Sequence, residues 1–153
     1  MKIQNQEIRY QHIYGQLETL LTKTKVPEAR MSTIIAVLHH KMPNFFWTGF
    51  YHLVDDELIV WCYQGPLACQ ILEKNKGVCW AAIQQQKTII VPDVEQFPGH
   101  IAYDSRSRSE IAVPLKDAGG NIKGVLDIDS QLIDNFNETD AKWLEKIIDM
   151  VYG

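Results

Sequence analysis

The sequence predicts an α+β fold in which helices flank an antiparallel sheet of about five to six strands. Amphipathic helical periodicity marks both ends of the chain, and two pairs of β-prone segments with short turns lie between them. The 153 residues are 46% hydrophobic and 22% charged, which is enough apolar material for one core. We therefore expect a single domain over 1–153 whose N- and C-terminal helices pack together.

Helical spacing of apolar residues predicts four helices, two of them before the first strand. Their ranges are 8–21, 27–42, 77–86 and 136–153. Proline at the first turn of the second helix suits a helix start. Asn137 or Thr139 is the expected N-cap of the last helix.

β-Branched and aromatic residues predict five extended segments. Their ranges are 46–54, 58–65, 88–92, 109–115 and 121–129. The acidic turn "DDE" joins the first two as a hairpin, and "KDAGG" joins the last two. The polar segment 95–108 is expected to be a long surface loop, and loops of this length are usually functional or disordered.

Composition argues against several classes of partner. A formal net charge of −4 and an isoelectric point near 5.7 leave no broad basic face for a nucleic acid. No apolar run approaches the ~20 residues of a membrane span, and the first twelve residues lack the apolar core of a signal peptide. We expect a cytoplasmic protein with a small-molecule ligand, with no nucleic-acid or membrane partner.

Three cysteines, Cys62, Cys69 and Cys79, are too few and of the wrong parity for a disulfide-stapled secreted domain. There is no Cys-x-x-Cys pair, and the adjacent His39 and His40 point apart on a helix, so no metal site is expected. Cys79 falls in the first turn of the third predicted helix, where backbone amides favour a thiolate and lower the pKa. Without the surrounding motif, the default interpretation of these cysteines is that they are buried thiols of the core.

Acidic and aromatic side chains form a candidate small-molecule site. Asp127 and Asp129 are two apart in a predicted strand and share one face, and Glu110 opens another strand. Trp47 and Tyr51, four apart, also share one face. By themselves, the carboxylates also suit a solvated strand end or a divalent metal site, and the aromatics suit a hydrophobic core.

Four segments together resemble one family, the GAF-domain free methionine-(R)-sulfoxide reductases. They are "WTGFY" at 47–51, "QGPLACQILEKNKGVCW" at 64–80, "DVEQFPGHIAYDSRSRSEIAVP" at 93–114 and "GVLDIDS" at 124–130. The resemblance implies a GAF/PAS-like fold, a pocket for free methionine sulfoxide and a homodimer. It also implies that no cofactor is bound and that thioredoxin or a similar reductant donates the electrons.

The family pattern has three functional cysteines. Cys69 and Cys79 match the first two, Tyr103 stands at the position of the third, and Cys62 matches none. The chemistry needs one thiol to attack the sulfoxide and a second to resolve the product as a disulfide. If the loop cysteine attacks, Tyr103 makes this chain inactive or badly impaired; if the residue matching Cys79 attacks, Cys79 and Cys69 are a working pair.

The resemblance also assigns ligand contacts. Glu110, Asp127 and Asp129 are implied to grip and protonate the substrate, and Trp47 and Tyr51 to hold its methyl-sulfur end. His100 and Asp104 beside Tyr103 are supporting candidates, and Arg106 and Arg108 place two positive charges near the pocket mouth or on a solvated face. The expected function is a free methionine sulfoxide reductase, or alternatively a catalytically silent ligand-binding GAF module.

Overall fold

The computed structural model describes residues 2–100 and 104–153, so the candidate residue Tyr103 lies outside the described residues. Five strands form one antiparallel sheet in the order β2-β1-β5-β4-β3. They are β1 (Trp47–Val54), β2 (Glu57–Gln64), β3 (Ile89–Val91), β4 (Ser109–Lys116) and β5 (Ile122–Ser130). Both predicted hairpins are present, and β1 and β5 pair to join them. The predicted α+β fold is confirmed.

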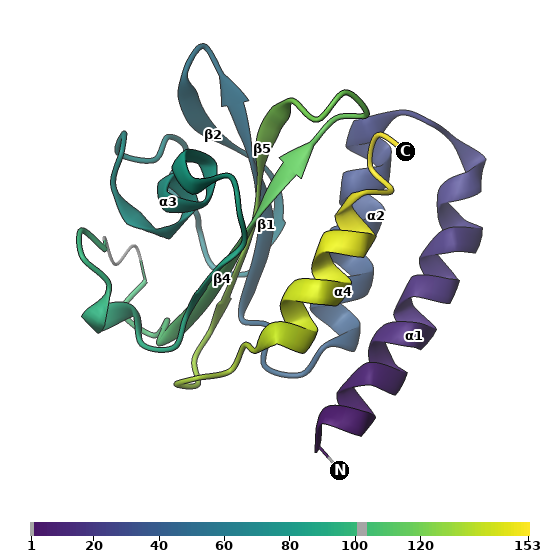
Figure 1. Ribbon diagram of the computed structural model, residues 1–153, viewed down its shortest axis with the longest axis horizontal. Coiled ribbons are helices and arrows are strands. Elements are labelled where there is room, and N and C mark those ends of the chain that lie inside the picture. The colour runs from purple at the N-terminus through teal and green to yellow at the C-terminus, as the bar shows by residue number, and fades with distance from the viewer. Residues whose placement is uncertain (1, 101–103) are drawn as a thin grey trace.

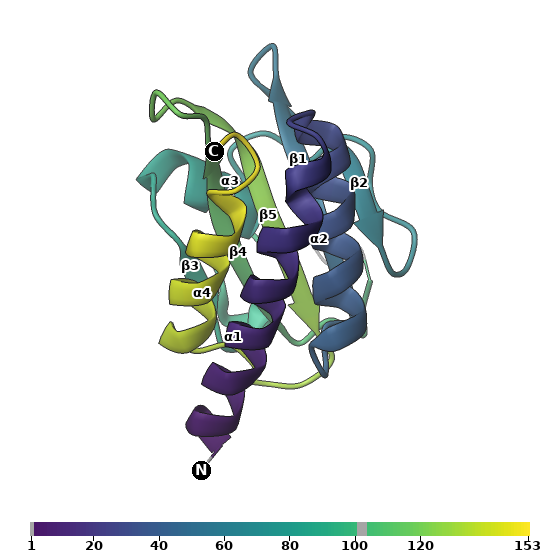
Figure 2. The same cartoon turned by 90° about the vertical axis from the view of Figure 1, so that its right-hand side faces the viewer.

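Helices cover the two faces of the sheet unequally. α1 (Lys2–Leu20), α2 (Pro27–Lys41) and α4 (Glu138–Ile148) lie on one face, and α3 (Gly77–Gln85) lies on the other (Figure 1). Figure 2 shows α1 running between α2 and α4, and it contacts both. The larger core fills the space between these three helices and the sheet, while a smaller core lies under α3.

The terminal helices pack together as expected. The ring of Tyr10 stacks on Trp143 with 6.2 Å between centroids, and its hydroxyl donates to the buried Asp140 carboxylate at 2.5 Å. Asn137, rather than Thr139, is the N-cap of α4. Its side chain accepts from the Asp140 amide, and Asp140 accepts from the Asn137 amide, which is a capping box. Pairing of these helices across a two-fold axis stays a prediction.

Helix α1 begins at Lys2, six residues before the predicted start. Residues 2–7 carry no continuous apolar stripe, but most of them are good helix formers. Glu7 also accepts hydrogen bonds from the side chains of Lys142 and Trp143 of α4. Tertiary contacts therefore extend the helix beyond its amphipathic segment.

Strand β3 is shorter than predicted. It ends at Val91 because Pro92 cannot donate to a strand ladder. A 3-10 turn, η2 (Val94–Gln96), follows, and the Asp93 side chain accepts from the Glu95 amide at 3.1 Å to begin it. A second 3-10 turn, η1 (Leu21–Lys23), follows α1. Among the described residues, no helix combines the length and apolar character that crossing a membrane requires.

Candidate functional site

The candidate site lies on the sheet face that α3 covers, and strand register brings its acidic residues together. Trp47 of β1 pairs directly with Asp129 of β5, which in turn pairs with Glu110 of β4. Side chains in one such row lie side by side on the same face. The two carboxyls are thus neighbours, although 19 positions separate them in the sequence. The predicted convergence of carboxyl groups is present in the structure.

Asp127 lies two residues before Asp129, in the next row whose side chains point to the same face, and small residues stand on both sides of it. Gly49 pairs with it from β1 and Ala112 pairs with it from β4. An added Cβ at Gly49 would lie 2.5 Å from Cη2 of Trp47 and 2.5 Å from Cβ of Tyr63. Only glycine therefore lets the indole lie across position 49, and the cavity wall beside Asp127 depends on it.

Aromatic rings form one wall of the site. The Trp47 ring stacks on Tyr51 and Tyr63, with 5.6 Å and 5.3 Å between centroids. Its Nε1–H donates to the carbonyl of Pro66 at 3.1 Å, which ties the loop after β2 to the wall. Burial and the surrounding negative charges raise the pKa of Tyr51, so its phenol keeps its proton.

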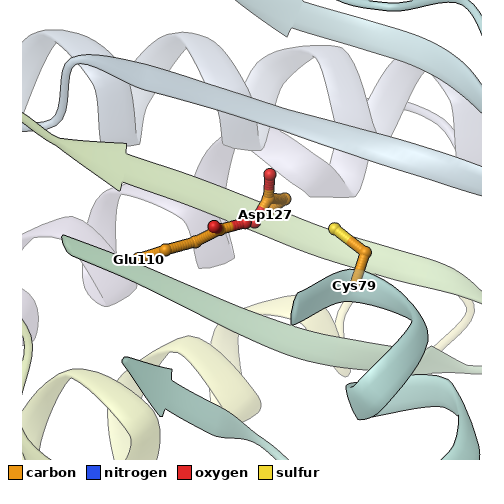
Figure 3. A group of neighbouring side chains, drawn as sticks. All are labelled: Cys79, Glu110 and Asp127. Atoms are coloured by element: carbon orange, nitrogen blue, oxygen red, sulfur yellow. The ribbon is translucent and has the colours of Figure 1, made fainter. Parts of the chain in front are cut away.

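Helix α3 brings a thiol to the carboxyl groups. Figure 3 shows Cys79 projecting from the first turn of α3 toward Glu110 and Asp127 on the sheet. The Cys79 sulfur and one carboxylate oxygen each of Glu110 and Asp127 all lie within 4.8 Å of one another. All three side chains are buried, with 4%, 7% and 5% of their residues' surface exposed.

Burial sets the proton affinity of the acidic groups. It raises the pKa of Glu110 well above its ordinary value, and the charges of Asp127 and Asp129 raise it further. The pKa values of Asp127 and Asp129 are also raised, in both cases mainly by burial. Because all three pKa values are raised, the cluster carries less negative charge than three independent carboxyls would. One of the three can therefore hold a proton at neutral pH.

The prediction that the helix start lowers the pKa of Cys79 and favours its thiolate is wrong. The helix position is as predicted, but burial and the negative charges of Asp127 and Glu110 raise the pKa of the thiol well above its ordinary value. The favourable effect of a helix start is small and local, whereas burial beside carboxylates acts directly on the sulfur. In the structure, Cys79 is therefore a neutral thiol.

Cys69 lies in the loop 65–76, which joins β2 to α3, and lines the same cavity as Cys79. It is half-buried, and its thiol donates to the carbonyl of Ile71 at 3.1 Å. The loop runs along the outer edge of β2, where the Val60 amide donates to the carbonyl of Gln70 at 2.8 Å. By contrast, Cys62 belongs to β2 and packs against the core on the opposite face of the sheet.

The loop before β4 contributes polar groups to the cavity. His100 Nε2 lies 3.8 Å from Glu110 Oε1, and burial lowers the pKa of the imidazole. Asp104 also lines the cavity, as predicted. Arg106 donates to both Asp104 oxygens, at 3.0 and 2.7 Å, and lowers the pKa of that carboxyl to about 2. The Arg106 charge is thus paired, and Arg108 does not line the cavity.

These side chains enclose one small cavity of about 70 Å³, large enough for several water molecules. The predicted residues that line it are Trp47, Tyr51, Cys69, Cys79, His100, Asp104, Glu110, Asp127 and Asp129. Sequence reasoning missed Phe46, Pro66, Leu67, Ala68, Leu72, Lys76 and Ser107, which also line it. It also missed Gly49, although an isolated glycine within a strand pattern is a signal of close approach.

An antiparallel five-stranded sheet with helices on one face and a small-ligand cavity on the other defines a GAF domain. The family model described as GAF domain matches residues 27–150. GAF domain-containing protein A of Dictyostelium discoideum is 47% identical over 149 residues, which cover 96% of this chain and 92% of that protein.

Relatives with a named activity are also similar. The free methionine-R-sulfoxide reductase of Escherichia coli is 37% identical over 120 residues, covering 78% of this chain and 72% of the relative. The X-ray structure of free methionine-R-sulfoxide reductase from Neisseria meningitidis in complex with its substrate superimposes with a TM-score of 0.88 at 38% identity. The superimposed region covers 94% of this chain and 86% of the Neisseria meningitidis chain. The chain belongs to the family of GAF-domain free methionine-(R)-sulfoxide reductases.

Proposed function

We propose that this protein binds free L-methionine-(R)-sulfoxide in the cavity under α3 and reduces it with Cys79 and Cys69. The observation that carries the proposal is the convergence of three acidic side chains and a thiol beside an aromatic wall. The residues are Glu110, Asp127, Asp129, Cys79 and Trp47. Membership of the family and the activity in the name of the Neisseria meningitidis relative support the choice of ligand.

The cavity chemistry suits a zwitterionic sulfoxide. An ammonium group is attracted by buried carboxylates, and Asp127 Oδ1 has no hydrogen-bond partner among the described residues. A protonated carboxyl of the cluster can donate to the sulfoxide oxygen. The stacked rings of Trp47 and Tyr51 offer an apolar surface for the methyl-sulfur end.

The reaction moves one oxygen atom and two electrons. The Cys79 sulfur attacks the sulfoxide sulfur, the oxygen takes up a proton, and methionine leaves while Cys79 becomes a sulfenic acid. The Cys69 thiol then displaces water from that sulfenic acid and forms a disulfide. A dithiol reductant of the thioredoxin class returns both sulfurs to thiols.

Ligand binding itself can activate Cys79. The negative charges of Asp127, Glu110 and Asp129 contribute to the raised pKa of the thiol. A bound ammonium would offset those charges, so the pKa of Cys79 falls when the substrate is in place. Attack is thereby coupled to occupancy of the cavity.

A second candidate function is ligand binding without reduction. It is favoured by one observation from the sequence, that Tyr103 stands where the family pattern has its third cysteine. A phenol has a pKa near 10 and cannot form a sulfenic acid or a disulfide. In this case the protein is a small-ligand GAF module with the carboxylate grip retained.

A single-turnover assay separates the two candidates. Fully reduced protein receives free L-methionine-(R)-sulfoxide, and methionine formed and thiols lost are counted, with binding followed by calorimetry. The variants are Tyr103→Cys and Cys79→Ser, and Cys62→Ser is the control because Cys62 lies across the sheet from the cavity.

Loss of two thiols per methionine in the unmodified protein, abolished by Cys79→Ser and unaffected by Cys62→Ser, is the expected result. Binding without methionine formation, together with rapid formation by Tyr103→Cys, would establish the silent module instead. Absence of binding in all variants would refute both.

A further inference from the structure

We propose that Cys79, Glu110 and Asp127 form a binding site for a divalent cation of the zinc type. We further propose that this ion and the amino acid ligand exclude each other. The three donors come from α3, β4 and β5 and meet at one point of the cavity (Figure 3). No pattern in the sequence pairs them, since Cys79 is 31 positions from Glu110 and 48 from Asp127.

The geometry is close to that of a loaded site. The three donor atoms lie within 4.8 Å of one another. Zinc binds sulfur at about 2.3 Å and carboxylate oxygen at about 2.1 Å, so donors in a tetrahedral site stand about 3.5 Å apart. Side-chain torsions alone can supply an approach of roughly 1 Å, because Glu110 has a flexible side chain.

An unpartnered oxygen points independently to a ligand. Asp127 is 95% buried, yet its Oδ1 atom has no hydrogen-bond partner among the described residues. Leaving a buried carboxylate oxygen without a partner destabilises the folded state, so such atoms are rare in folded proteins. Cations and ammonium groups are the partners that a carboxylate accepts most readily.

The donor set selects the class of ion. A thiolate is a poor ligand for Mg²⁺ or Ca²⁺ but a good one for Zn²⁺, and carboxylates complete a mixed sulfur and oxygen set. Three protein donors leave a fourth position open for water.

Electrostatics favours the ion in the same way. Three carboxyl groups, those of Glu110, Asp127 and Asp129, line one cavity, and two of them are buried. As a divalent cation binds, the thiol of Cys79 and any protonated carboxyl release their protons to solvent, and the ion then neutralises two of the negative charges left in a region of low dielectric constant. The same groups are proposed to grip the substrate, so occupancy by one excludes the other; this second claim alone rests on the proposed function.

The first experiment measures the ion without any amino acid. Reduced protein, stripped with a chelator, is dialysed against Zn²⁺, and in parallel Co²⁺ is added to detect the sulfur-to-cobalt charge-transfer absorption that only a thiolate ligand gives. We expect one ion per chain and the absorption band. Cys79→Ser should abolish the band, and Asp127→Asn should weaken zinc binding more than about tenfold.

Cys62→Ser is the matched control, because it removes a half-buried thiol on the other face of the sheet. It should leave stoichiometry and spectrum unchanged. Absence of the band in the unmodified protein, or its retention in Cys79→Ser, overturns the site. The band in the unmodified protein is read without any variant, and none of these readouts needs catalytic activity.

The second experiment adds the ligand. Free L-methionine-(R)-sulfoxide should displace Co²⁺ and bleach the band in proportion to its occupancy. Persistence of the band at a ligand concentration that saturates the protein by calorimetry overturns mutual exclusion. If calorimetry detects no ligand at all, the proposed function fails while the metal site stands on the first experiment.

Discussion

Gly49 pairs with Asp127 across β1 and β5, and the indole of Trp47 occupies the space where a side chain at position 49 would stand. The absence of a side chain at Gly49 therefore allows the Trp47 ring to form the aromatic wall beside the Asp127 carboxyl. A residue that carries no functional group thus controls the shape of the candidate site.

Gly49→Ala is expected to abolish ligand binding while the protein remains folded. The added Cβ would lie 2.5 Å from both Trp47 and Tyr63, so the indole must move into the cavity. Overpacking of this kind costs about 1–3 kcal/mol of folding free energy. Calorimetric titration and thermal unfolding measure the two effects.

The control for this substitution is Gly15→Ala in α1, where an added Cβ meets nothing within 4 Å. Alanine there should stabilise the helix by up to about 1 kcal/mol and leave binding intact. Unimpaired binding by Gly49→Ala would contradict the role assigned to the glycine.

Replacing Glu110 by Gln is expected to stabilise the protein, and more so at higher pH. Because burial raises the pKa of Glu110, the folded state prefers the protonated acid. The stability that this group contributes is complete below its unfolded pKa of about 4 and is lost as pH rises through the folded value. Glutamine stays neutral, so it avoids that loss.

Thermal unfolding at about pH 5 and about pH 8, with chelator present, checks the sign. The melting temperature of Glu110→Gln should exceed that of the unmodified protein by more at the higher pH. Glu57→Gln at the exposed start of β2 is the control and should show no such trend. A smaller advantage at high pH would refute the assignment.

The three cysteines should react in a defined order with an alkylating agent. Cys69 is half-buried at the cavity, whereas Cys79 is buried and its pKa is raised well above the ordinary value. Each unit of pKa lowers the thiolate fraction tenfold near neutral pH, so Cys79 should react at least about tenfold more slowly than Cys69. Pulsed alkylation and mass spectrometry of the native protein measure the rates.

Denatured protein is the reference for this measurement, since all three thiols should then react alike. Cys62, whose pKa is raised by burial, should also be slower than Cys69. Faster labelling of Cys79 than of Cys69 in the ligand-free protein would contradict this order and would support the thiolate that the helix position of Cys79 predicted.

Tyr10→Phe is expected to destabilise the protein without affecting the site. The Tyr10 hydroxyl donates to the buried Asp140, and its loss leaves a carboxylate short of a partner at a cost of about 1–3 kcal/mol. The pair lies on the opposite face of the sheet from the cavity. Chemical denaturation and ligand titration test the two halves of the prediction.

Tyr14→Phe is the matched control, because the Tyr14 ring meets the same Trp143 edge-on at 5.9 Å. It should change the free energy of unfolding by less than Tyr10→Phe does. Equal losses in the two variants would mean that ring packing, and not the hydrogen bond to Asp140, carries the effect.

Local patterns in the sequence were enough to predict most elements, both hairpins, the family and which residues share a strand face. These properties are local: helical and alternating periodicities, turn residues and motif spacing are visible within a few positions. The pairs Trp47 with Tyr51 and Asp127 with Asp129 were therefore predictable, and all four residues line the cavity.

Two features of the site could be seen only in the folded chain. They are the strand register that sets Asp129 beside both Trp47 and Glu110, and the need for glycine at position 49, where the Trp47 indole lies. The tertiary structure also reversed the expected pKa shift of Cys79. The helix start that favours a thiolate is a local feature, but the carboxyls that oppose it arrive from strands 31 and 48 positions away. Burial and charge are sums over neighbours in space, and those neighbours exist only once the chain has folded.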